Sequence, residues 1–219
     1  MLMRQAKSFR EEGTTMKEKT IKIYKFSELS REAQMKVVEN HGGDFVNNDY
    51  WYEWVYEDFK DELKSKYGFI VEDMSFSGFW SQGDGASFTG EFADPIEVVD
   101  TLLKDYLYPI EQVCLKNLVD YIGITRDTNH YVHKYTVSCA FSIKDIETNK
   151  EELWDNTLEQ RRSYDTLERK INEWKNEMCD KLYKELEDTY DFLTGYEHVA
   201  DYYTNCDDEE QFLEDGSDA

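Results

Sequence analysis

An amphipathic repeat of about forty residues near the C-terminus constrains the fold more than any other feature of the sequence. Its apolar residues recur at intervals of three, four and seven, the spacing of one face of an α-helix. A helix of that length spans about 60 Å. Because a chain of 219 residues cannot cover it completely, we expect it to be broken, to pair with the helix expected over 94–123 or to meet a second copy in a homodimer. The repeat consists of Leu153, Leu158, Tyr164, Leu167, Ile171, Trp174, Met178, Leu182, Leu186, Tyr190 and Leu193.

Residues 75–92 predict a β-hairpin in which two aromatic-rich strands flank a Gly-Asp-Gly tip. The register that pairs Trp80 with Phe88 across a three-residue loop places the large apolar side chains on one face. A loop of two or four residues would mix the two faces, so the pattern favours the odd loop. Gly78 then lies opposite Gly90, and the pair leaves a notch where a ligand or a side chain can approach the backbone.

Strict alternation of apolar and polar residues over 131–143 predicts a strand of a second hairpin, with its turn at 127–129. A shorter alternating stretch, 20–26, predicts an N-terminal strand. The two hairpins and this strand indicate an antiparallel sheet of about five strands.

Helical spacing predicts helices over 27–42, 49–68 and 94–123, with Pro109 breaking the third of them. We expect Ser27 or Ser30 to cap the first helix and Asp94 to cap the third, and we expect Gly68 to end the second. A short helix over 193–205 follows the long amphipathic repeat. Hairpins separated by groups of helices indicate an α+β fold, in which the helices pack on the antiparallel sheet and a long helix lies near the C-terminus.

The charge of the chain is strongly negative. Its 48 acidic and 25 basic residues give a net charge of −23. This charge favours solubility and repels nucleic acids and anionic lipids, so we expect a partner with a basic surface and no direct binding of nucleic acid. We also expect a flexible basic leader over 1–19, a single α+β domain over 20–205 and a disordered acidic tail over 206–219.

The cysteines indicate a reducing compartment. Cys114, Cys139, Cys179 and Cys206 are widely separated and form no C-x-x-C motif, as expected of free thiols in a cytoplasm. The sequence contains no apolar run of the ~18 residues that a membrane span requires. The N-terminus has no apolar signal core, and Met16 is an alternative start of translation.

The hairpin sequence FSGFWSQGDGASF (76–88) resembles a family of small acidic proteins encoded by bacteriophages and prophages. The stretches HYVHKYTVS (130–138) and LYKELEDTYDFLTGYEHVADYYTN (182–205) carry the same resemblance, and IYKFSELSREAQ (23–34) is similar to the start of that family. The resemblance covers nearly all of 20–205. It implies a phage origin and the cytoplasm of a bacterial host, and it implies no particular activity.

The hairpin tip is the first candidate site. It gathers hydroxyl, amide and carboxylate groups beside glycine amides, and together with the second hairpin it can surround a small ligand or the backbone of a partner. The alternative is a structural turn, because Gly and Asp are the residues that a tight hairpin needs. The candidate binding residues are Trp80, Ser81, Gln82, Asp84, Ser87, Tyr131 and His133.

The second candidate is an acidic helical surface. Carboxylates on the helix over 49–68, joined by those near the end of the long helix, form rows that can imitate the phosphates of DNA. The alternative is an ordinary solvated helix face. The residues of this surface are Glu53, Glu57, Asp58, Asp61 and Glu62.

Three functions agree with these features, and no catalytic motif, metal spacing or cofactor motif accompanies them. The first is a phage accessory protein that binds and inhibits a host or defence protein through its acidic surface. One version of this function is mimicry of nucleic acid. The second is a protein that binds or cleaves a nucleotide signal at residues 80–87. The third is an antitoxin-like neutraliser of a basic toxin, which shares the physics of the first.

Overall fold

A computed structural model describes residues 22–48, 50–127, 131–143, 158–205 and 211–219. These residues form an α+β fold with one antiparallel sheet of four strands and a long helix near the C-terminus. The strands are β1 (Phe69–Phe76), β2 (Ala86–Phe92), β3 (Val119–Arg126) and β4 (Val137–Ile143). The helices are α1 (Arg31–His41), α2 (Glu53–Tyr67), α3 (Pro95–Val98), α4 (Pro109–Leu118), α5 (Leu158–Thr194) and α6 (Tyr196–Asn205). Short turns of 3-10 or π-helix are η1 (Phe26–Glu28), η2 (Gly42–Val46), η3 (Val99–Leu103), η4 (Lys104–Tyr106) and η5 (Lys134–Thr136).

The sheet has the order β1-β2-β3-β4, in which each strand is antiparallel to its neighbours. The expectation of about five strands is therefore wrong by one. Within the described part of 20–26, Tyr24 forms only an isolated bridge with Phe212, and Phe26 begins η1. The N-terminal segment packs near the end of the chain and does not extend the sheet.

The register of the first hairpin differs from the predicted one. Met74, rather than Trp80, lies opposite Phe88, and the chain leaves β1 after Phe76 to form a loop over 77–85. A register shift interrupts the pair near the start of β1. The side-chain pattern alone did not reveal this longer loop.

Aromatic packing outside the sheet explains the longer loop. Phe76 stacks on Phe79 with ring centroids 5.7 Å apart, and Phe79 also contacts Trp51 at 6.4 Å and Tyr190 at 5.2 Å. Trp80 follows with a positive φ of 67° and stays 68% exposed. These rings therefore pack on α5 and on the start of α2, and not across a strand pair.

The predicted notch is occupied by the protein itself. Gly90 lies opposite Val71 and not opposite Gly78, and the backbone carbonyl of Ile70 fills the space where a side chain at position 90 would lie. This close approach of two backbones, together with the φ of 151° at Gly90, requires glycine.

The helix predicted over 94–123 ends early. Pro109 starts α4 as expected, but α4 ends at Leu118 and the next residues form β3. Ile122 and Ile124 are buried in this strand, between β2 and β4. Burial of β-branched residues within a sheet outweighs the helical spacing of this segment.

Half of the strand predicted over 131–143 forms. β4 begins at Val137, and the preceding residues form the 3-10 turn η5. The Nδ1 atom of His133 accepts a hydrogen bond from the backbone amide of Tyr135, and Lys175 of α5 donates to the carbonyls of Lys134 and Val137. These side-chain contacts hold the turn in place of a strand. The predicted turn at 127–129 lies largely outside the described residues.

Several helix boundaries follow the predicted chemistry. The hydroxyl of Ser30 caps α1 by accepting a hydrogen bond from the amide of Ala33. The carboxylate of Asp94 caps α3 by accepting one from the amide of Ile96. Gly68 ends α2 in the left-handed conformation, with φ 63°.

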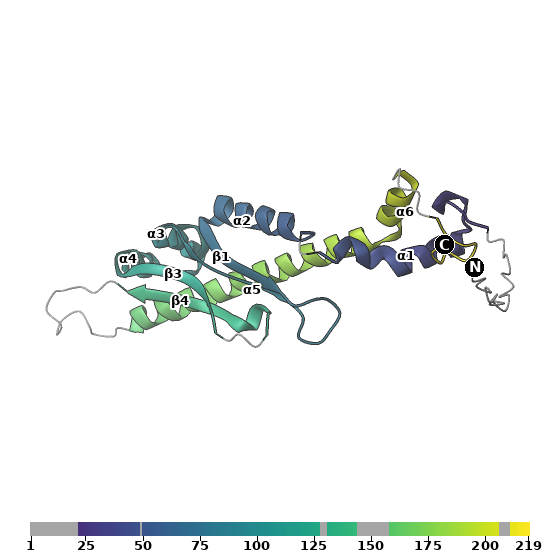
Figure 1. Ribbon diagram of the computed structural model, residues 1–219. Coiled ribbons are helices and arrows are strands. Elements are labelled where there is room, and N and C mark those ends of the chain that lie inside the picture. Colours follow the sequence, from purple (N-terminus) through teal and green to yellow (C-terminus); the bar gives the residue numbers. More distant parts are fainter. Residues whose placement is uncertain (1–21, 49, 128–130, 144–157, 206–210) are drawn as a thin grey trace, which may run out of the picture.

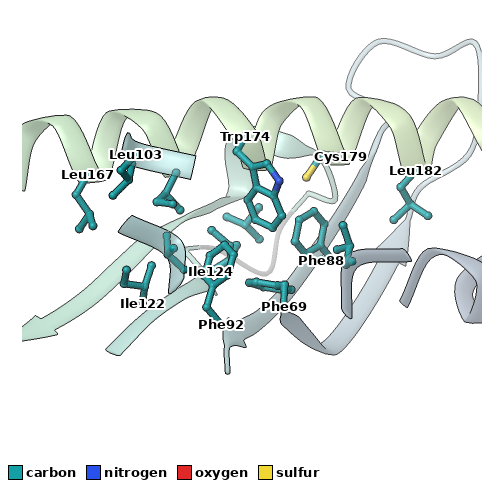
Figure 2. Close-up of a cluster of buried hydrophobic side chains, with 14 of the residues drawn as sticks. Phe69, Phe88, Phe92, Leu103, Ile122, Ile124, Leu167, Trp174, Cys179 and Leu182 are labelled. Carbon is teal, nitrogen blue, oxygen red and sulfur yellow. The ribbon is translucent and has the colours of Figure 1, made fainter. Parts of the chain in front are cut away.

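The main core lies between α5 and the sheet, with α2 at its side. Trp174 of α5 is 6% exposed and points into a group of three phenylalanine rings, as Figure 2 shows. Its ring centroid lies 5.3 Å from Phe69, 5.9 Å from Phe88 and 5.1 Å from Phe92. Such aromatic contacts bury large apolar areas and fix the position of the helix on the sheet.

The long helix α5 is continuous from Leu158 to Thr194, which excludes the alternative of a break there, and it packs against α4, as the alternative of pairing with the third predicted helix requires. Leu153 lies outside the described residues. The helix runs beyond the sheet to a second group of elements around α1 and α6 (Figure 1). That group has a core of its own, formed by Phe26, Leu29, Ala33, Val37 and Phe212. The predicted pairing through a second copy stays a prediction.

The end of the chain packs into this second core. Residues 211–219 belong to the predicted disordered tail, yet Phe212 is 1% exposed and exchanges two backbone hydrogen bonds with Tyr24, at 2.8 and 2.9 Å. Lys36 binds Asp215 at 2.9 Å. The burial of Phe212, its backbone hydrogen bonds to Tyr24 and the Lys36–Asp215 pair together hold this segment in the second core. Residues 206–210 lie outside the described residues.

Candidate functional site

An acidic groove separates α2 from α5. The helices run antiparallel along it, because Lys181 pairs with Glu62 at one end and Tyr190 contacts Trp51 at the other. The cavity has a volume of about 320 Å³. We define the acidic groove by its lining residues, Trp54, Val55, Asp58, Glu62, Glu185, Asp188 and Thr189.

Ion pairs close the Glu62 end of the groove. Lys181 binds Glu62 and lies 3.6 Å from Glu185, and Lys66 binds the other oxygen of Glu62 at 2.8 Å. The hydrogen bonds from Lys181 and Lys66 lower the pKa of Glu62. This carboxylate is therefore ionised and neutralised within the protein.

The middle of the groove is less well neutralised. Within the described part of the chain, Asp58 forms no ion pair and no side-chain hydrogen bond. Burial raises the pKa of Glu185, and the charges of Glu62 and Asp58 raise it further, while Lys181 opposes them. Carboxylates from two helices thus lie close enough to repel one another.

Trp54 lies one helical turn before Asp58 on the same side of α2. Its side chain is 56% exposed, and its ring stacks on no other ring of the described residues. Val55 beside it is buried and contributes to the apolar side of the groove. The groove therefore combines an open aromatic face with unneutralised negative charge, an environment that favours a cation.

The structure divides the predicted acidic surface into two parts. Asp58 and Glu62 line the groove, whereas Glu53, Glu57 and Asp61 lie on the exposed outer side of α2. The carboxylates of Glu185 and Asp188 complete the groove from α5.

Sequence reasoning did not assign a role to Trp54 or Thr189. Trp54 lies four residues before Asp58 and eight before Glu62, so helical spacing alone places the three residues on one face of the helix. The pairing of that face with α5 depends on the tertiary structure.

The hairpin-tip residues occupy different environments. Trp80 is exposed and contacts Tyr190 with ring centroids 5.3 Å apart. The carboxylate of Asp84 accepts a hydrogen bond from the amide of Ser81 at 2.7 Å, which closes the turn. Ser87 is fully buried, and its hydroxyl accepts a hydrogen bond from Arg126. Gln82 is exposed.

The loop over 77–85 does meet the segment before β4. The hydroxyl of Ser77 donates to the carbonyl of Val132 at 3.2 Å, and Gly85 packs against His133. The rings of Tyr131 and His133 are nearly parallel, with centroids 6.2 Å apart. The structure thus brings the two predicted halves of this site side by side, although Trp80 leans toward α5.

Two further observations concern the described residues only. They include no helix that is both long and apolar enough to cross a membrane. They also contain no group of three or more His, Cys, Asp or Glu side chains arranged to hold a metal ion. The carboxylates of the acidic groove are thus not grouped as metal ligands.

Comparison with known proteins identifies one family. Residues 51–195 match the family described as "Domain of unknown function (DUF8835)", a range that covers more than half of the chain and includes every residue of the acidic groove. No curated protein and no solved structure matches the chain. From α2 to the end of α5, the chain belongs to the DUF8835 family.

Proposed function

We propose that this chain is an interaction protein that binds a partner with a basic surface through the acidic sides of α2 and α5. The observation that carries this proposal is the convergence of carboxylates from both helices on one groove. Asp58 forms no ion pair with any described residue there, and Glu185 is partly buried beside Glu62 and Asp58. Surfaces of one charge attract partners of the opposite charge and raise their association rates. The net charge of −23 acts in the same direction.

The proposed setting is the cytoplasm of a bacterial host, with a phage or prophage as the source of the gene. The partner is a host or defence protein that the chain inhibits, and the acidic helices act as a mimic of nucleic acid when the partner normally binds DNA or RNA. An antitoxin that neutralises a basic toxin uses the same surface. The identity of the captured partner separates these versions.

The proposal is tested by reversing charge on the outer side of α2. Glu57→Lys with Asp61→Lys changes two exposed carboxylates outside the groove lining. A partner is first captured from bacterial lysate with tagged protein and then purified for calorimetry. We expect the affinity of the double variant to fall by about ten-fold or more, and that of the unchanged protein to fall as salt increases.

The matched control is Glu32→Lys with Glu39→Lys, which makes the same change of charge at two exposed positions of α1, outside the proposed surface. Equal losses in both variants would indicate a response to net charge alone. An affinity that neither salt nor the α2 variant alters would exclude the proposed surface.

A small-ligand function at the hairpin loop is the second candidate. Trp80 combines a positive φ with high exposure. The carboxylate of Asp84 closes the same loop by accepting a hydrogen bond from the amide of Ser81. Strained, exposed residues are concentrated at functional sites. If Trp80→Ala and Asp84→Asn leave the retention of every nucleotide and metabolite from lysate unchanged, this candidate is excluded.

A further inference from the structure

We propose that the acidic groove is a receptor for a single arginine side chain from a basic segment of the partner protein. The arginine stem lies along Trp54 and Val55, and its guanidinium faces Asp58. This inference rests on the proposed function, because it specifies how a basic partner is recognised.

The size of the groove matches one side chain. At about 320 Å³ it lies at the lower limit of small-molecule sites, too small for a helix or a strand. The ion pair of Glu62 with Lys181 joins the two helices on one side of the groove, and the ring contact of Trp51 with Tyr190 joins them on the other. A partner therefore reaches the middle of the groove by inserting a projecting group.

The charge of the groove favours a cation. Lys181 lies between Glu62 and Glu185, and Lys184 binds Asp188 at 2.9 Å and Glu187 at 3.0 Å. These lysines are shared among several carboxylates. Asp58 receives none of them and lies one turn from the exposed ring of Trp54. Burial is the main cause of the raised pKa of Glu185, and an entering cation would offset the smaller contribution from the charges of Glu62 and Asp58.

The chemistry of the lining favours arginine over lysine. A guanidinium is planar, stacks on the face of an indole and can donate two parallel hydrogen bonds to one carboxylate. An ammonium is a strongly hydrated point charge. It therefore loses more hydration free energy on leaving water, and it gains less interaction energy from the ring of Trp54. The apolar side of the groove, formed by Trp54 and Val55, suits the aliphatic stem that both residues share. Tryptophan and arginine are both enriched among the residues that contribute most of the binding energy at protein interfaces.

The test uses the full chain and two small probes, N-acetyl-L-arginine amide and N-acetyl-L-lysine amide. Each is titrated while the indole N–H resonances of the five tryptophans are followed by NMR, and Trp54→Phe identifies the resonance of Trp54. We expect the arginine probe to shift that resonance with a Kd on the order of 1 mM. The lysine probe should bind at least three-fold more weakly.

Two variants on neighbouring positions of α2 complete the experiment. Asp58→Asn should lower the affinity for the arginine probe about five-fold. Glu57→Gln removes an exposed carboxylate from the outer side of α2 and should change that affinity less than two-fold. Equal shifts with both probes, or no effect of Asp58→Asn, would overturn the arginine receptor. So would a Trp54 resonance that moves on dilution of the protein alone, because a second copy would then occupy the groove.

The outcomes separate this inference from the proposed function. If the partner binds normally to Trp54→Ala and Asp58→Asn but poorly to Glu57→Lys with Asp61→Lys, the acidic surface binds the partner and the groove does not receive an arginine. If the α2 charge reversal has no effect while the arginine probe still binds as expected, the groove is a cation site and the proposed acidic interface is wrong.

Discussion

At the scale of single residues, the groove holds carboxylates in places that stability alone does not favour. Asp58 has no cation among the described residues, and Glu185 is partly buried beside two other acids. Residues that reduce stability are typical of binding sites, because the binding partner supplies the missing interaction.

Glu185→Gln should therefore stabilise the free protein, and more so at higher pH. Burial and neighbouring acids raise the pKa of Glu185 above 4.5 in the folded chain. As pH rises past the unfolded value, the unfolded state releases this proton first, so ionisation at this position lowers the free energy of unfolding. Because the carboxylate is partly exposed, the gain should stay within about 1 kcal/mol.

The measurement is urea unfolding of both proteins between pH 4 and pH 8. The advantage of the glutamine variant should grow as pH rises above 4.5 and become constant once the carboxylate is also ionised in the folded protein. A constant difference, or one that favours the unchanged protein at pH 8, would mean that the Lys181 contact outweighs the repulsion.

Local chemistry predicted the helix ends well and the strand register poorly. Ser30, Asp94 and Gly68 act within a few residues of their own position, so the sequence specifies them directly. Register depends on which surface receives the side chains. Phe79 and Trp80 contact Tyr190, more than one hundred residues away in the chain, and alternation carries no information about that contact.

At the scale of elements, the β1–β2 pair depends on the absence of a side chain at Gly90. Gly90→Ala should destabilise the protein on the order of 3 kcal/mol, because its methyl group would meet the carbonyl of Ile70 and φ is 151°. Gly43→Ala is the matched control, since nothing lies within 4 Å of the position that its methyl group would take. Thermal unfolding of both variants provides the comparison, and similar melting temperatures would contradict the tight pairing.

At the scale of the whole molecule, α5 connects two cores that lie at different places along its length (Figure 1). The first lies at the sheet and the second around α1, α6 and Phe212. The family match ends at residue 195, at the junction between α5 and α6, so it contains the sheet and the groove and leaves the second core outside. The groove therefore belongs to the part of the fold that the family shares.

The second core should depend on Phe212. Phe212→Ala should cost that core about 3–5 kcal/mol and increase hydrogen exchange in α1, while exchange in β2 and β3 changes little. Gln211→Ala, at an exposed position next to it, is the control. Equal increases of exchange in α1 and in the sheet strands would show that the two cores unfold as one unit.

The sequence by itself determined the α+β class, the long amphipathic helix, the helix caps and the acidic face of α2, because each depends on periodicity or on neighbours within a few residues. Only the tertiary structure decided the strand count, the register of the first hairpin and the packing of Phe212 against Tyr24. It also decided that Asp58 and Glu62 meet Glu185 and Asp188 across a groove. The reason is that helical spacing shows which face a residue occupies, whereas the element that packs beside that face is selected by contacts between distant parts of the chain.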